Sequence, residues 1–399
     1  MSNKEQRKAP VLRFKGFTDD WEQHKLGELS IIQSGKTPSS HNLKNYYPSE
    51  IPWVRTGDLN NDLIISCEKY ISKQGAKSLS FLPPNTVLIA MYGGFNQIGR
   101  TGLLTFSATI NQALASILPN SITNSYFLLE LLNKHKNDWR RIAASSRKDP
   151  NITKKDIENK NLFFTTKREQ KQIENIIFHL SKLISLQQRK LDTFLSLKKS
   201  ISDKVFNDKI NNSHSVFFKN RVKGKYLFML SNKKGQPELP VLSATQDKGM
   251  VLRDSINKNI QYDNVNLSNY KVIEPGDFVI HLRSFQGGFA YSNITGITSP
   301  AYNIFKFKNK FPYNPTYWKE KFRSYSFIQL LKKVTYGIRD GRTISFNDFS
   351  SLYLTFPDIG TQNRIGKLFN SINNQIDIQQ RIVKDLKDIR HFLLQNMFI

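Results

Sequence analysis

The stretch that decides the fold is residues 167–206, KREQKQIENIIFHLSKLISLQQRKLDTFLSLKKSISDKVF, which contains neither proline nor glycine. Its apolar residues recur at heptad spacing through Ile173, Leu180, Phe194 and Ile201, which predicts one long amphipathic helix. Residues 361–398 repeat this pattern, with a single glycine in the first turn. A helix of about 40 residues is roughly 60 Å long. Such a helix is marginal alone, so we expect the two helices to pack on each other.

The second helix belongs to a longer internal repeat. From residue 146 onward, a constant separation of 192 residues aligns the two halves without a gap. The matched residues include Arg147 and Arg339, Asp156 and Asp348, and the Gln-Gln-Arg runs that begin at 187 and 379. Upstream, a separation of 191 pairs Tyr126 with Tyr317. The order is globular segment, helix, globular segment, helix, so the helices should run antiparallel about a pseudo two-fold axis.

Each globular segment mixes short strand-like runs with one helix. Strands are expected at 86–91, 112–118, 278–282 and 302–307, and helices at 124–144 and 315–334. The runs Thr153-x-x-Asp156 and Ser345-x-x-Asp348 look like capping boxes. The predicted class is α+β: two mixed α/β domains joined by two long antiparallel coiled-coil helices, as a pseudo two-fold repeat. The expected boundaries are 1–163 and 207–356 for the globular domains, and 164–206 and 357–399 for the helices.

The charge of the chain points to a polyanionic partner. Fifty-nine Lys and Arg against 32 Asp and Glu give a net charge of +27. A low-GC genome also enriches lysine, so the placement of the charge is more informative. Residues 134–148 and 319–342 each carry a net charge of +5, just around Arg147 and Arg339. Because the excess recurs at the same place in both halves, we favour phosphate contact over a merely solvated face.

Several catalytic and membrane classes are disfavoured. The single cysteine, Cys67, excludes a disulfide framework or multi-cysteine zinc site and indicates a cytoplasmic protein. No apolar run reaches the ~20 residues of a membrane span. Ser34-Gly35-Lys36-Thr37 lacks the upstream glycine of a P-loop, and Pro38 would obstruct its helix, so it reads as a turn. We expect no metal, no cofactor and no catalytic activity.

Two glycine-rich loops are candidates for reading DNA. Residues 92–100 and 281–288 each follow a matched strand and carry arginine and amide side chains, which recognise guanine and adenine edges. A plainer explanation of the two loops is that they are hairpin turns. Likewise, Arg147 and Arg339 could form salt bridges with the nearby Asp149 and Asp340 instead of contacting DNA. The candidate DNA-binding residues are Arg55, Tyr92, Asn96, Gln97, Arg100, Arg147, Lys148, Thr245, Gln246, Lys248, Arg283, Ser284, Gln286, Arg339 and Arg342.

Several strings resemble the specificity (S) subunits of type I restriction-modification systems. They are LRFKGFTDDWEQHKLGEL at 12–29, IPW at 51–53, GDL at 57–59, PGDF at 275–278, SFQGG at 284–288, GITSPAY at 296–302 and YGIRDGR at 336–342. The resemblance implies two target-recognition domains that read a bipartite double-stranded DNA site. It also implies two methyltransferase (M) subunits docked along the helices, joined by restriction/translocase (R) subunits. The Trp21–Gly27 string has no copy before the second domain, whose start is therefore open.

Two alternatives stay open at this point. The chain could be an autonomous two-headed DNA-binding regulator or architectural protein, in which the helix pair is only a spacer. It could also be a nuclease, which would require metal-dependent cleavage by the isolated chain. Binding of a second protein by apolar residues on the outside of the helix pair would separate the first alternative from a specificity subunit.

The two basic segments give a first prediction. Arg147→Ala should weaken binding to one half-site and Arg339→Ala binding to the other. Each phosphate contact contributes about −0.9 to the log-log slope of affinity against salt, so each variant should show a shallower slope. Fluorescence anisotropy of a labelled duplex over a salt series measures this. An affinity that does not depend on salt, or two variants that bind as wild type, would contradict DNA contact by these segments.

Overall fold

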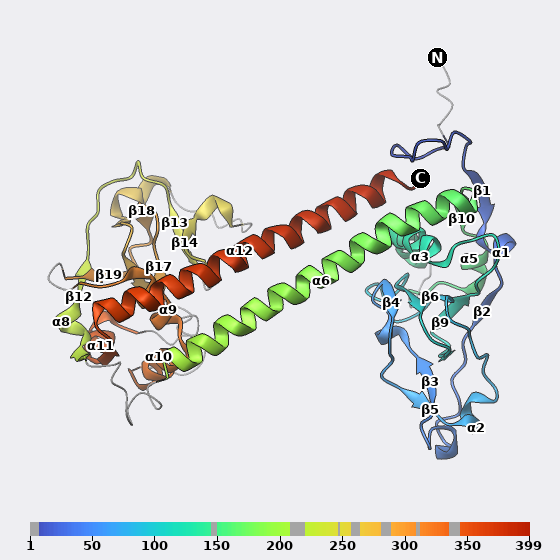
Figure 1. Ribbon diagram of the computed structural model, residues 1–399, viewed down its shortest axis with the longest axis horizontal. Helices are drawn as coiled ribbons and strands as arrows, with labels where there is room; N and C mark the ends of the chain where they lie inside the picture. Colours follow the sequence, from blue (N-terminus) through green and yellow to red (C-terminus); the bar gives the residue numbers. More distant parts are fainter. Residues whose placement is uncertain are drawn as a thin grey trace, which may run out of the picture. The chain divides into compact units, whose positions relative to one another are not determined.

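The computed structural model describes residues 8–144, 150–207, 220–245, 248–256, 264–280, 289–308, 312–334 and 344–399. The chain forms two compact units. Unit 1 comprises Met1–Gln187 and Ile382–Ile399, and unit 2 comprises Gln188–Arg381. Each unit therefore holds one globular core and one segment of each long helix (Figure 1).

Unit 1 is built on a five-stranded sheet in the order β2-β9-β6-β7-β4. Its central strand β6 is buried at all four positions, as expected for an apolar strand covered on both faces. Val87 and Ile89 face the core under the helices, whereas Leu88 and Ala90 face a second, smaller core. The strands are β2 (Ile32–Ser34), β4 (Asp62–Ile64), β6 (Val87–Ala90), β7 (Thr101–Leu104) and β9 (Leu114–Ile117).

The remaining strands of unit 1 form two separate, smaller sheets. A three-stranded sheet has the order β5-β3-β8, and β1 pairs antiparallel with β10. These strands are β1 (Glu22–Lys25), β3 (Ile51–Val54), β5 (Tyr70–Ile71), β8 (Thr109–Ile110) and β10 (Asn161–Phe164). The helices are α1 (Leu26–Leu29), α2 (Lys73–Ala76), α3 (Ser125–Lys134), α4 (Lys136–Ala144) and α5 (Lys154–Glu158).

Unit 2 has a four-stranded sheet in the order β12-β19-β16-β17, packed on an aromatic core. The core residues include Phe228, Phe278, Phe289, Phe305, Phe322 and Phe349, all fully buried. Phe278 stacks on Phe305 with 5.5 Å between ring centroids. Such pairs contribute about 0.5–1.5 kcal/mol each beyond their buried area, so aromatic packing holds this unit together.

Smaller sheets and helices complete unit 2. The strands are β11 (Asn220–Lys223), β12 (Phe228–Ser231), β13 (Leu242–Thr245), β14 (Gly249–Leu252), β15 (Lys271–Ile273), β16 (Phe278–Ile280), β17 (Ala290–Tyr291), β18 (Gly296–Thr298), β19 (Asn303–Phe307) and β20 (Tyr353–Phe356). The helices are α8 (Gly224–Leu227), α9 (Pro315–Arg323), α10 (Tyr325–Leu331) and α11 (Phe346–Ser351). Pairs form between β11 and β20, β13 and β14, and β15 and β18.

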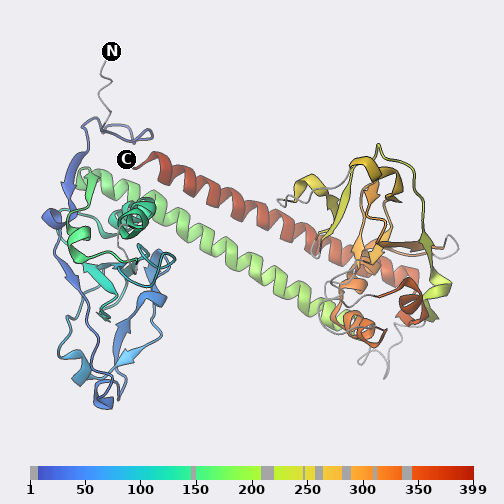
Figure 2. The same cartoon turned by 180° about the vertical axis from the view of Figure 1, so that it is seen from behind.

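The two predicted long helices are confirmed as α6 (Lys167–Val205) and α12 (Ile359–Asn396). In unit 1, α6 begins at the globular core, and α12 ends there with Phe398 stacked on Phe127 at 5.2 Å. In unit 2, α12 begins at the core, and after α6 ends Phe206 stacks on Phe369 at 5.8 Å. Within each unit the two segments therefore lie side by side and run antiparallel (Figures 1 and 2).

Corresponding junctions tie each core to the helix that follows it. In unit 1, Gln170 of α6 accepts a hydrogen bond from Asn124 N and donates one to Thr165 O. In unit 2, Gln362 of α12 accepts a hydrogen bond from Asn314 N and donates one to Pro357 O. Asn124 and Asn314 also cap the N-termini of α3 and α9. The predicted capping box at Thr153 is confirmed on α5. At α11 only half of the predicted box forms: Ser345 Oγ accepts a hydrogen bond from Asp348 N, but the Asp348 carboxylate accepts from the Ser345 hydroxyl instead of the Ser345 backbone N–H.

Two details of the sequence interpretation are corrected. The predicted helix 124–144 is broken at His135 into α3 and α4, and 315–334 is broken at Ser324. The reason in unit 2 is that Ser324 caps α10 by accepting a hydrogen bond from Phe327 N. The caps Asn124 and Asn314 are 190 residues apart, so Phe127, not Tyr126, corresponds to Tyr317.

The sequence left the start of the second globular segment open, and its first described strand is β11 at Asn220. Strand β11 pairs with β20 in the same antiparallel manner as β1 pairs with β10. Helices α1 and α8 follow β1 and β11 directly. The backbone arrangement thus recurs from Asn220 although the side chains of residues 22–29 do not, because strand pairing requires only backbone groups.

The asparagine caps give a prediction about stability. Asn124→Ala and Asn314→Ala should each lower the free energy of unfolding by about 1–2 kcal/mol, because each removes a side-chain acceptor for helix N–H groups. Urea denaturation followed by circular dichroism measures the change. Asn175→Ala is the matched control, because Asn175 is exposed inside α6 and caps nothing. Cap variants as stable as this control would contradict the assignment.

Candidate nucleic-acid interface

The loop 92–100 of unit 1 connects β6 to β7 and is a preorganised turn. Gly93, Gly94 and Gly99 have φ angles of +114°, +78° and +73°, a region that favours glycine. Gly94 O accepts hydrogen bonds from Gln97 N at 2.9 Å and Ile98 N at 3.1 Å. Ile98 is fully buried and anchors the loop in the core. The loop therefore presents its tip in a fixed conformation.

The tip of this loop presents aromatic and amide side chains. Tyr92 is 41% exposed and Phe95 is 49% exposed, and Asn96 is exposed beside them. Gln97 is half-buried, and its Oε1 accepts no hydrogen bond from the described residues. Aromatic faces stack on bases and amides read adenine edges, so this combination suits contact with nucleic acid.

Arg55 lies next to the loop. A Cβ built on Gly93 would meet the side chains of Gln97 and Thr56, so the loop packs against the residue that follows Arg55. Arg55 Nη2 donates to Glu68 Oε2 at 3.3 Å, and Glu68 is largely exposed. Exposed pairs of this kind contribute little, so the pair leaves the guanidinium available to another anion.

A basic cluster joins the loop to helix α4. A Cβ on Gly99 would lie 2.9 Å from Trp139 Cβ, so the loop sits directly on α4. Burial lowers the pKa of Lys136, and the positive charges of Arg140 and Arg100 lower it further. Like charges held together are unfavourable by themselves and are relieved by a bound anion. We call Arg100, Lys136 and Arg140 the basic cluster.

The predicted residues divide into those the structure places and those it does not. Arg55, Tyr92, Asn96, Gln97 and Arg100 are brought together in unit 1. Phe95 and the α4 residues Lys136 and Arg140 were absent from the predicted set. The sequence carried two signals for them: an aromatic residue directly after two glycines, and the +5 charge of residues 134–148. Eight predicted residues lie outside the described residues: Arg147, Lys148, Gln246, Arg283, Ser284, Gln286, Arg339 and Arg342.

In unit 2, Thr245 and Lys248 lie at the tip of the β13–β14 hairpin. The Thr245 hydroxyl donates to Gly249 O at 2.8 Å and accepts from Lys248 N at 3.1 Å. Thr245 therefore holds the turn, whereas the Lys248 side chain is exposed. The turn predicted at residues 34–37 is not observed: Ser34 ends β2, and the next residues are irregular chain in which Gly35 N donates to Leu114 O and Lys36 N to Ile110 O.

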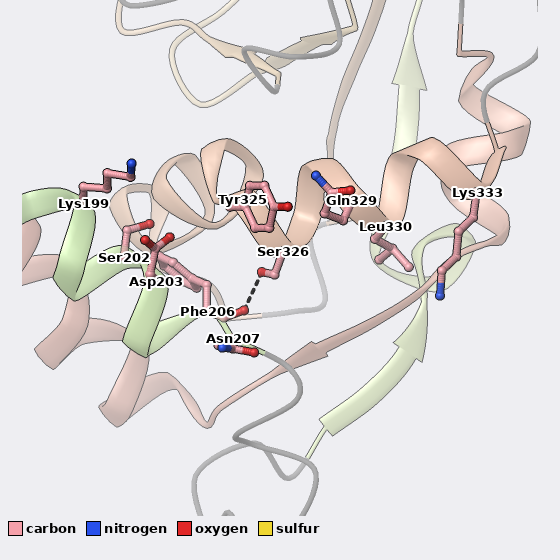
Figure 3. Close-up of a pocket in the computed structure, with 10 residues that line it drawn as sticks. All are labelled: Lys199, Ser202, Asp203, Phe206, Asn207, Tyr325, Ser326, Gln329, Leu330 and Lys333. Atoms are coloured by element: carbon pink, nitrogen blue, oxygen red, sulfur yellow. Dashed lines mark hydrogen bonds between the residues drawn. The ribbon is translucent and has the colours of Figure 1, made fainter.

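A cavity of about 770 Å³ lies in unit 2 where the end of α6 meets α10 (Figure 3). The Ser326 hydroxyl donates a hydrogen bond to Phe206 O in its wall (Figure 3). Its described lining includes one carboxylate, Asp203, and no histidine, so it lacks the pairs typical of acid-base catalysis. The described residues form no group of three or more His, Cys, Asp or Glu able to hold a metal ion. In the same part of the chain, no helix has the length and apolar character that crossing a bilayer requires.

Comparison with known proteins identifies relatives. Residues 18–194 match the family model for a type I restriction modification DNA specificity domain. The type I restriction enzyme EcoR124I/EcoR124II specificity subunit of Escherichia coli is 24% identical over 139 residues, 34% of each chain. The type I restriction enzyme MjaIX specificity subunit of Methanocaldococcus jannaschii is 22% identical over 176 residues, 43% of this chain and 40% of that protein. The matched region spans less than half the length of both relatives.

Solved structures share the fold over nearly the whole chain. The type I restriction-modification S subunit from M. genitalium superposes with a TM-score of 0.59 at 14% identity, covering 98% of this chain and 99% of that one. A chain from a study of complex assembly and conformational transition of the type I R-M system gives 0.53 at 15% identity, covering 95% and 97%. The resemblance and the fold class predicted from the sequence are thereby confirmed.

The basic cluster yields a prediction. If the Arg100 guanidinium contacts a base, Arg100→Ala should weaken DNA binding by about 1–3 kcal/mol. If it contacts a phosphate, the variant should lose affinity uniformly across DNA sequences and show a shallower dependence of affinity on salt. Competition anisotropy with cognate and scrambled duplexes distinguishes the two cases. Arg189→Ala removes the same charge from an exposed position on α6 and serves as the matched control. If Arg100→Ala bound DNA as well as this control does, the cluster would have no part in binding.

Proposed function

We propose that this chain is the specificity subunit of a type I restriction-modification system, a non-catalytic subunit that recognises a bipartite double-stranded DNA target. One unit would read each half of the target. The chain would direct two methyltransferase subunits and the restriction/translocase subunits to that target in the cytoplasm.

The observation that carries this proposal is the arrangement around loop 92–100. A rigid loop presents exposed Tyr92, Asn96 and Phe95 directly beside the basic cluster. Phosphate contacts position a protein on DNA and base contacts specify the sequence, and this surface offers groups for both. The DNA specificity domain matched at residues 18–194 includes this entire surface.

The long helices support the role in assembly. They expose large apolar residues that their mutual packing leaves uncovered, which marks a protein-binding surface. In unit 1 these residues are Ile176, Leu183, Leu186, Ile382, Ile389 and Phe392, and in unit 2 they are Leu195, Leu197, Leu368 and Ile378. An autonomous regulator would have no use for such a surface, so we favour the specificity subunit.

The decisive experiment maps methylated bases across the host genome with and without this gene. We expect one bipartite motif to lose its methylation when the gene is deleted and to regain it on complementation. Unchanged methylation would count against the proposal. Metal-dependent cleavage of DNA by the purified chain alone would favour a nuclease instead.

Exchange of the second globular segment gives a further prediction. Replacing residues 216–356 by the matching segment of another specificity subunit should change one half of the methylated motif and leave the other half intact, because each core carries its own loops. Methylation mapping of the chimera checks this. A motif changed in both halves would contradict the proposal that each core reads its own half-site. The control is a gene in which residues 216–356 are replaced by their own sequence through the same cloning steps.

A further inference from the structure

A cluster of positive charge covers the two-stranded β11–β20 sheet of unit 2. Arg221 and Lys223 belong to β11, and Lys225 follows in α8. Arg221 and Lys225 are exposed, and Lys223 is partly exposed. A fourth cation, Lys308, donates from Nζ to Lys225 O at 2.8 Å. We call Arg221, Lys223 and Lys225 the β11 cations.

One tyrosine ring orders two of these side chains. Lys223 lies directly opposite Tyr353 of β20 in the strand register. The Arg221 guanidinium carbon lies 4.6 Å from the centre of the Tyr353 ring, and Lys223 Nζ lies 5.2 Å from it. Both distances are within the range of about 6 Å over which the face of an aromatic ring attracts a cation. The ring therefore holds charges that would otherwise move freely in solvent.

No described carboxylate neutralises the β11 cations. In the same unit, Lys198 pairs with Glu320 and Lys233 pairs with Glu274. By contrast, none of the β11 cations forms a salt bridge with any Asp or Glu that the structure describes. Like charges held close together are unfavourable by themselves, and a bound anion relieves them. This surface therefore selects an anionic partner.

The tyrosines distinguish one anionic partner from another. Single-stranded nucleic acid binds by stacking its bases on open aromatic rings. Here the rings carry cations instead, since Lys225 Nζ also lies 5.2 Å from the centre of the Tyr226 ring. Two residues of a strand advance about 6.6 Å, which is close to the rise of two base pairs. Cations held at this spacing suit the phosphate backbone of a duplex.

The β11 cations lie away from the candidate reading residues of the β13–β14 hairpin. The four-stranded sheet has the order β12-β19-β16-β17, and α8 leads directly into β12 at one edge. At the other edge, a Cβ on Gly249 of β14 would lie 2.4 Å from Tyr291 O of β17, so the hairpin packs there (Figure 1). Three strand spacings of about 4.8 Å equal the rise of about four base pairs. The cations therefore meet a stretch of DNA that this hairpin does not read.

Unit 1 repeats the backbone of this surface without its charge. Strands β1 and β10 pair in the register of β11 and β20, and α1 follows β1 as α8 follows β11. The positions of the β11 cations are occupied there by Gln23, Lys25 and Gly27, and the position of Tyr353 by Asn161. A contact made by the three cations therefore belongs to unit 2 alone.

We propose that the β11 cations bind backbone phosphates of double-stranded DNA beside the half-site that unit 2 reads, and that unit 1 makes no equivalent contact. This contact does not depend on the DNA sequence. Tyr353 is a positioning residue, because it orients two of the cations and touches no phosphate itself. The inference rests on the proposed function, since it presupposes that each unit has its own half-site.

Ethylation interference tests the proposal, because an ethylated phosphate loses its charge. The assay uses the full chain, purified from its host with the subunits that it binds, and a duplex that carries the methylated motif. In the wild type, ethylation of phosphates beyond the motif should weaken binding next to one half-site. The double variant Arg221→Gln, Lys225→Gln should lose this interference and no other.

The same double variant should change the salt dependence of binding. Each phosphate contact contributes about −0.9 to the log-log slope of affinity against salt, so the loss of two contacts should make the slope less negative by about 1.8. Affinity should fall equally for motif and scrambled duplexes. The matched control is Arg189→Gln, Lys190→Gln, which removes the same two charges from exposed positions on α6 and should keep the wild-type slope and pattern.

Substitution of the ring separates positioning from net charge. Tyr353→Phe keeps the aromatic face and should keep the interference pattern. Tyr353→Leu leaves the net charge of the chain unchanged, yet it should weaken the interference at the same phosphates, because the cations lose the ring that orders them.

Identical interference patterns for the wild type and the Arg221→Gln, Lys225→Gln variant would overturn the proposal and would direct the β11 cations to an acidic protein surface instead. A wild-type chain without any preference for the motif duplex over a scrambled duplex would refute the proposed function itself, before any variant is compared.

Discussion

The structure depends on the burial of each long helix end in a globular core. Phe398 packs between Trp21 and Phe127 in unit 1, and Phe206 packs on Tyr317 and Phe369 in unit 2. Without these contacts, helices of 39 and 38 residues would have nothing at their far ends to pack against. Unit 1 combines residues 1–187 with the distant segment 382–399, whereas unit 2 is the contiguous segment 188–381 and includes a part of both helices.

This constraint explains where polar groups are buried. The ends of α6 and α12 meet core helices whose carboxylates Glu130 and Glu320 are removed from water, and burial of a charge is tolerated only when it is paired. The partners come from residues more than 120 positions away in the chain. Apolar burial therefore holds the helices on the cores, while the polar contacts select one arrangement among several that would bury similar area.

The candidate interface depends on the same scaffold. Loop 92–100 has its conformation set by glycines at positive φ and by Ile98 in the core, and its position is set by Trp139 of α4. Helix α4 follows α3 in the chain, and Glu130 of α3 is hydrogen-bonded to Arg390 of α12. Functional side chains are thus displayed from irregular segments, whose placement is determined by regular elements beneath them.

The sequence by itself determined the long helices, their order between the globular segments, the capping box at Thr153, the N-cap at Ser345 and the basic segments, because these follow from local periodicity and composition. Tertiary structure decided the helix breaks at His135 and Ser324, the strand pairing that begins at Asn220, and the placement of Arg55 beside loop 92–100. So was the pairing of Glu130 with Arg390, 260 positions apart. A local sequence pattern predicts only the conformation of neighbouring residues. The partner of a buried charge is fixed only when folding brings distant helices together.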